Sequence, residues 1–71
     1  MDPYISYSAD RRATWVGHPS KLGVRRAIDT ARRGRRWSGP RDLIIFSLEH
    51  TPSGRVYVEI PPEDWTTEFA D

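Results

Sequence analysis

The order of apolar and polar residues predicts a β-hairpin near the N-terminus. Residues 4–8 and 12–16 are short runs rich in Tyr, Ile, Thr, Trp and Val, and a turn-like stretch of residues 8–11 separates them. Aromatic and β-branched residues favour strands, and two such runs in close succession are expected to pair. A helix capped at Ser8 and running to Trp15 is the competing interpretation of the same stretch.

The clearest strand pattern lies in the second half of the chain. Residues 42–50 and 55–60 are β-rich, and Thr51-Pro52-Ser53-Gly54 joins them with residues typical of a hairpin turn. Side chains two positions apart share one face of a strand, and this alternation predicts a core of Ile44, Phe46, Leu48, Val56, Val58 and Ile60. The opposite face is half apolar, so we expect the tail or a partner to cover part of it. That face holds Leu43, Ile45, Ser47, Glu49, Arg55, Tyr57 and Glu59.

A helix is expected between the two hairpins. Its apolar residues recur with helical spacing in one narrow stripe, formed by Val24, Ala27, Ile28 and Ala31. Pro19 suits the first helical turn, with Ser20 as an alternative N-cap. The helix should end near Arg33, with Gly34 supplying the left-handed residue that often follows a helix.

The C-terminal part predicts a short helix or turn. Pro61 and Pro62 end the last strand, and residues 62–69 place Trp65 and Phe69 four positions apart, where they can pack together. The whole chain, residues 1–71, is therefore expected to be a single α+β domain. Its antiparallel sheet has β-β-α-β-β order, with one main helix packed on it and a short C-terminal helix or turn.

Composition narrows the class of protein. A chain of 71 residues has a small core, and the lack of cysteine excludes disulfides and thiolate metal sites. The longest apolar run is residues 43–46, far short of a membrane span, and the first residues lack the pattern of a signal peptide. We therefore expect a cytoplasmic protein that does not enter a membrane and that holds no metal or cofactor.

Charge is divided sharply along the chain. Residues 11–41 hold ten cationic side chains against one carboxylate, a net charge of +9. Residues 1–10 carry −2 and residues 42–71 carry −6, so the total is only +1. All but one of the cationic residues in the whole chain are arginine, which pairs bidentately with phosphate and carboxylate and stacks on aromatic rings. Such an asymmetry indicates a contact surface.

The basic segment supplies the candidate site. Its arginines are expected to anchor phosphates or carboxylates, and Trp37 to stack on a base or fill an apolar recess. The candidate residues are Arg25, Arg26, Arg32, Arg33, Arg35, Arg36, Trp37 and Arg41. Two other interpretations stay open: an acidic patch on a partner protein, and arginines paired internally with the chain's own acidic strands and tail.

The remaining groups of polar residues are weaker evidence of function. The acidic tail with Trp65 and Phe69 either imitates nucleic-acid phosphate or docks its two aromatic rings on the domain, and docking is the favoured interpretation. His18 and His50, with Tyr57 and Glu59, suit acid–base chemistry, but no spacing fixes them together. No serine stands in a nucleophile motif, so no catalytic residue is assigned.

The resulting hypothesis is a small non-enzymatic binding protein that uses an arginine-rich helix and loop to contact an acidic partner, with nucleic acid ranked first. The alternative is a small inhibitor or regulator, of phage or accessory type, that blocks another protein. The third is a toxin-like, metal-independent ribonuclease. Homodimerisation through an edge strand or the half-apolar sheet face is also open.

Overall fold

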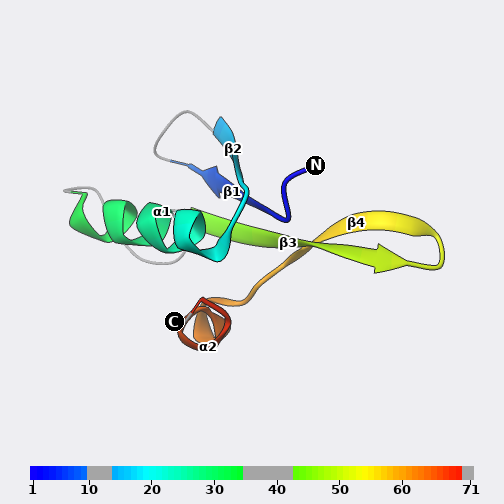
Figure 1. Ribbon diagram of the computed structural model, residues 1–71. Coiled ribbons are helices and arrows are strands. Elements are labelled where there is room, and N and C mark those ends of the chain that lie inside the picture. Colours follow the sequence, from blue (N-terminus) through cyan, green and yellow to red (C-terminus); the bar gives the residue numbers. More distant parts are fainter. Residues whose placement is uncertain (10–13, 35–42, 70–71) are drawn as a thin grey trace.

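A computed structural model describes residues 1–9, 14–34 and 43–69, and it shows an α+β fold (Figure 1). A four-stranded sheet is formed by β1 (Tyr4–Ser8), β2 (Thr14–His18), β3 (Leu43–Thr51) and β4 (Gly54–Glu59). The spatial order is β2-β1-β3-β4, and every neighbouring pair is antiparallel. The main helix α1 (Lys21–Arg33) follows β2, and a 3₁₀ turn, η2 (Pro62–Asp64), leads into the short C-terminal helix α2 (Trp65–Glu68).

The N-terminal hairpin is confirmed, with its second strand two residues later than predicted. Trp15 pairs with Tyr7, and Gly17 and His18 belong to β2 and not to the turn before the helix. Gly17 fits this position because the Asp2 carboxylate occupies the place where a Cβ atom would project. Glycine usually weakens a strand, but at position 17 a larger residue would collide with the Asp2 side chain.

Helix α1 begins at the alternative N-cap. The Ser20 hydroxyl accepts a hydrogen bond from the Gly23 amide, with 3.4 Å between the two atoms, and Pro19 lies before the cap and outside the first turn. Gly34 has φ −66° and ψ 141°, so it ends the helix in extended conformation and the predicted left-handed residue there is wrong. Among the described glycines, Gly54 has a positive φ of 126°, and it opens β4 opposite Thr51.

The predicted core is largely wrong, and strand pairing explains why. Of its six residues, Ile60 alone is buried, whereas Val56 and Val58 are 44% and 40% exposed. Ile45 instead is fully buried, because it faces α1 and α2. The buried cluster consists of Val24, Ile28, Leu43, Ile45, Ile60, Trp65 and Phe69, with Tyr4 and Ala31 packed at its margin.

Pairing also separates the two sets of residues that alternation assigns to one core. Phe46 lies opposite Glu59 and Leu48 lies opposite Tyr57, whereas Val58 lies opposite Ser47. Directly paired residues project from the same face of an antiparallel sheet. Ile44, Phe46 and Leu48 therefore project away from the helices, and Val56, Val58 and Ile60 project from the helix side of the sheet.

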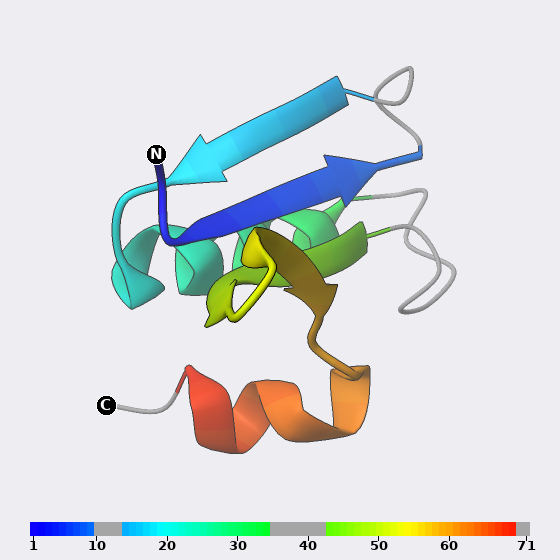
Figure 2. The ribbon, with the colours of Figure 1, turned by 90° about the vertical axis from the view of Figure 1, so that its right-hand side faces the viewer.

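The C-terminal segment docks on the helix side of the sheet, as expected from its two aromatic residues. The Trp65 indole Nε1 donates a hydrogen bond of 3.1 Å to the Ile60 carbonyl, and Trp65 and Phe69 are 4% and 2% exposed. The Phe69 ring also meets Tyr4 edge-on, with 5.5 Å between ring centroids. Figure 2 shows α1 behind β1 and β3, with α2 beneath the sheet. Within the described part of the chain, neither helix is long and apolar enough to cross a membrane.

Candidate functional site

The four described candidate arginines lie on α1 in two stripes. Arg25 and Arg32 are seven residues apart, as are Arg26 and Arg33, and seven residues is nearly two helical turns, or about 10 Å. Arg26, Arg32 and Arg33 are exposed, and Arg25 is half-buried. Because Val24 and Ile28 take the buried face of α1, both stripes lie off the core and remain at the surface.

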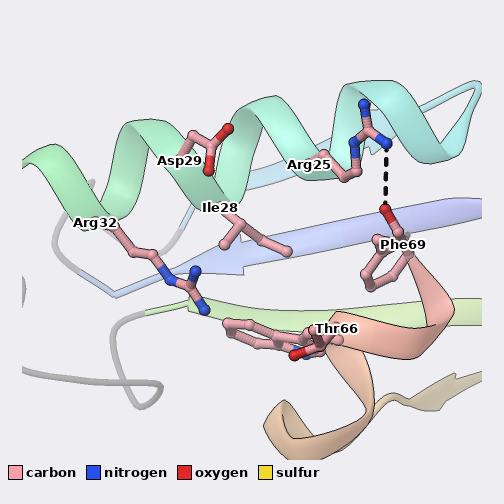
Figure 3. Close-up of a pocket in the computed structure, with 7 residues that line it drawn as sticks. Arg25, Ile28, Asp29, Arg32, Thr66 and Phe69 are labelled. Atoms are coloured by element: carbon pink, nitrogen blue, oxygen red, sulfur yellow. Dashed lines mark hydrogen bonds between the residues drawn. The ribbon is translucent and has the colours of Figure 1, made fainter. Parts of the chain in front are cut away.

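One arginine of the first stripe has a structural contact. The Arg25 guanidinium donates a hydrogen bond of 3.5 Å to the carbonyl oxygen of Phe69, the residue that ends α2 (Figure 3). Unsatisfied carbonyls at a helix C-terminus carry partial negative charge, so a cation is stabilising there. Arg25 therefore helps to hold α2 against α1, and its guanidinium is partly engaged within the fold.

A small pocket lies between the two helices. It has a volume of about 230 Å³, and Figure 3 shows Arg25 and Arg32 reaching from α1 toward the α2 side, where Thr66 and Phe69 lie. Its full lining is Arg25, Ile28, Asp29, Arg32, Trp65, Thr66 and Phe69. This volume is below the range of about 300–1,000 Å³ that is usual for small-molecule sites, so the pocket is better described as a notch in a basic surface.

Two acidic residues of the tail line a different part of the surface. Asp64 and Glu68 line a separate pocket of about 320 Å³ together with Glu49 of β3 and Glu59 of β4. The α2 segment thus meets α1 through Trp65, Thr66 and Phe69 and directs these two carboxylates to its other side. This arrangement argues against pairing of Arg25 and Arg32 with Asp64 or Glu68, because neither carboxylate lines the notch that contains the two arginines.

The rest of the predicted site lies outside the described residues. These are Arg35, Arg36, Trp37 and Arg41, which the sequence places between α1 and β3. The sequence alone shows that Arg35 and Arg36 follow the C-terminal end of α1 almost directly.

The structure separates the histidines of the ribonuclease hypothesis. His18 pairs across the sheet with Tyr4, which in turn lies opposite Ser47, so His18 belongs to the helix side. His50 has the same parity as Phe46 on β3 and pairs with Arg55, so it projects from the opposite face. The two imidazoles therefore do not form the joint site that this hypothesis requires.

His18 instead makes a buried polar pair that sequence reasoning missed. Its Nε2 atom lies 2.7 Å from the Ser6 hydroxyl oxygen, and the two residues are 7% and 4% exposed. Both line a pocket of about 330 Å³ between α1 and the β1–β2 side of the sheet, where Arg26 also lies. The only sequence signal for this pair would be the hairpin register, because twelve residues separate its members.

The burial of His18 predicts a pH-dependent stability. Desolvation lowers the pKa of His18 below its ordinary value of 6.5, and the nearby Asp2 carboxylate offsets part of that shift. As the pH falls through 6.5, the unfolded chain takes up a proton more readily than the folded one. The contribution of His18 to the free energy of unfolding is therefore greatest above pH 6.5. It decreases as the pH falls below 6.5, by no more than about 1.4 kcal/mol per pH unit.

Urea unfolding at pH 7.5, 6.5 and 5.5 measures this effect, because most carboxylates titrate below that range. The matched control is His18→Gln, which keeps a polar side chain and removes the titrating group. Its free energy of unfolding should change less over the same interval, and an equal fall in both proteins would contradict the assignment to His18.

Comparison with protein-family models, with curated protein sequences and with solved structures gives no match to this chain. The function is therefore argued from the residues themselves.

Proposed function

We propose that this protein binds nucleic acid through the outer face of α1. The observation that carries the proposal is the placement of Arg26 and Arg33, both exposed and nearly two turns apart, with Arg32 exposed beside them. The tail carboxylates Asp64 and Glu68 line a pocket on another side of the molecule. Neither of these two carboxylates lines the notch beside Arg25 and Arg32, which supports contact of the arginines with an external anion.

The chemistry of the face suits a phosphate backbone. Each guanidinium offers a fork of donors to phosphate oxygens, and each phosphate that it neutralises releases a condensed counterion. Arg26 and Arg33 lie about 10 Å apart along the helix, so each can contact a different phosphate. In the sequence, Arg35, Arg36 and Arg41 continue the same charge beyond the helix and would raise the number of contacts.

A salt titration of oligonucleotide binding tests the proposal. Fluorescence anisotropy with single-stranded and duplex DNA and RNA should show an affinity that falls steeply between about 50 and 200 mM salt. Arg33→Ala should weaken binding to every sequence tested and reduce the slope of log affinity against log salt by about one. The double change of Arg26 and Arg33 to Ala should reduce it by about two.

Arg55→Ala is the matched control, because it removes the same charge from β4, on a hairpin that extends beyond the helices (Figure 1). Its slope should stay close to that of the unchanged protein. Absence of binding at about 50 mM salt, or an equal loss from Arg55→Ala and Arg33→Ala, would overturn the proposal. Absence of binding would also direct the search to an acidic protein surface.

A further inference from the structure

The pocket of about 330 Å³ between α1 and the β1–β2 side of the sheet has the size of a ligand site. Both layers present small side chains to it, with Ala27 and Ala31 on α1 and Ser6 on β1. The larger helix residues Val24 and Ile28 pack instead in the buried cluster. The volume lies within the range of about 300–1,000 Å³ that is usual for small-molecule sites, unlike that of the notch between the two helices. We call this space the helix–sheet pocket.

The helix–sheet pocket combines apolar walls with a few polar groups. We call four of its lining residues the apolar wall: Val16, Ala27, Ala31 and Leu43. Arg26 is exposed, so it marks the mouth of the pocket, whereas Ser6 and His18 are 4% and 7% exposed and mark its inner end. The Ser6 hydroxyl oxygen and the His18 Nε2 atom, 2.7 Å apart, form a polar pair there. Apolar walls with a small number of convergent polar groups are the usual composition of a ligand site.

The charges around the helix–sheet pocket favour an anion at its mouth. No carboxylate lies among the described residues of its lining, and Asp29, three residues beyond Arg26, lines the notch beside α2 instead. Desolvation lowers the pKa of His18, so its imidazole is predominantly neutral at pH 7.5 and adds no charge at the inner end. A guanidinium pairs bidentately with a carboxylate. The complementary ligand therefore has one carboxylate and an apolar body.

The volume limits the size of that apolar body. A dry cavity of about 150 Å³ holds one benzene ring, so the helix–sheet pocket has room for two fused rings or an acyl group of similar bulk. The apolar wall offers such a body van der Waals contact from both the helix and the sheet.

We propose that the helix–sheet pocket binds a small monocarboxylate with an apolar body, whose carboxylate pairs with Arg26 and whose body packs against the apolar wall. The polar pair of Ser6 and His18 then lies at the end of the body remote from the carboxylate. This site shares Arg26 with the proposed nucleic-acid face, and the other arginines of that face do not belong to its described lining.

Titration of the full chain with 2-naphthoate at pH 7.5, followed through the NMR shifts of the backbone amides, tests the site. The probe should bind saturably with a Kd of about 1 mM or less, and the largest shifts should lie at Val16, Ala27 and Ala31. The neutral probe 2-naphthamide has the same rings and should bind at least about fivefold more weakly. Arg26→Gln should abolish this preference for the carboxylate.

Two variants should block the helix–sheet pocket from opposite sides. Val16→Phe fills it from β2 and Ala27→Leu fills it from α1, and each should weaken both probes by about tenfold or more. Val16 is 44% exposed on an edge strand and phenylalanine favours strands, whereas leucine favours helices. Both variants should therefore keep the circular dichroism spectrum of the folded domain.

The matched control is Arg33→Gln, which removes the same charge from an exposed position of α1 outside the described lining of the pocket. It should keep the preference for 2-naphthoate and reduce the salt slope of oligonucleotide binding. Ala27→Leu should do the reverse, so failure of the ligand site is distinct from failure of nucleic-acid binding. No saturable binding of 2-naphthoate up to about 5 mM, or an equal loss from Arg26→Gln and Arg33→Gln, would overturn the proposal. Shifts centred on Trp15 and Phe46, on the other face of the sheet, would also overturn it.

Discussion

Trp65→Ala is expected to lower the free energy of unfolding by about 3–5 kcal/mol. Trp65 is 4% exposed, packs in the cluster with Ile28 and Ile45, and donates its indole hydrogen bond to the Ile60 carbonyl. Truncation leaves a cavity and deprives a buried carbonyl of its donor. In a domain with a total stability of about 5–15 kcal/mol, this is a large share.

Thermal unfolding followed by circular dichroism measures the loss, which should lower Tm by roughly 15–30 °C in a domain of this size. Trp65→Phe keeps an aromatic ring and removes the hydrogen bond, so its stability should fall between those of the unchanged protein and Trp65→Ala. Thr66→Ala, an exposed neighbour on the same helix, is the control and should stay within about 0.5 kcal/mol. If Trp65→Ala proved as mild as Thr66→Ala, α2 would not be docked on the core.

The docking of α2 shows what local patterns can predict. Trp65 and Phe69 are four positions apart after two prolines, and this spacing alone indicates a packed aromatic pair. The α+β class, the two hairpins and the main helix follow from similarly local signals, because periods of 2 and 3.6 residues are properties of short segments. The alternative cap at Ser20 is a signal of the same local kind.

Which face of β3 is buried could not be predicted from the sequence of the strand alone. Both of its faces are apolar, with Leu43 and Ile45 on one and Ile44, Phe46 and Leu48 on the other. A shift of one residue exchanges the two faces, so alternation alone cannot choose between them. The choice depends on which face α1 and α2 cover, and this is a long-range contact.

The candidate site also has some features that local spacing predicts and others that depend on long-range contacts. Helical spacing separates the Arg25 stripe from the Arg26 stripe without a structure. The contact of Arg25 with the Phe69 carbonyl joins residues 44 positions apart, and no local pattern signals it. The Ser6–His18 pair likewise depends on the register of β1 against β2, and the sequence pattern ends that second strand before His18.

Ile45→Ala compared with Ile44→Ala tests which side of β3 forms the core. Ile45 is fully buried beneath the helices, and its truncation should cost about 2–5 kcal/mol. Ile44 is half-buried on the face of the sheet turned away from both helices, and the same truncation there should cost about 1 kcal/mol, because less apolar area and a smaller cavity are involved. The two variants match in chemistry and differ by one position.

Urea unfolding of each variant gives both values, because the free energy of unfolding falls linearly with denaturant concentration. The milder changes Ile45→Val and Ile44→Val should preserve the order, with smaller losses of up to about 1.5 kcal/mol. A greater loss from Ile44→Ala than from Ile45→Ala would mean that the monomer buries the face holding Phe46 and Leu48, and that the helices cover that side of the sheet.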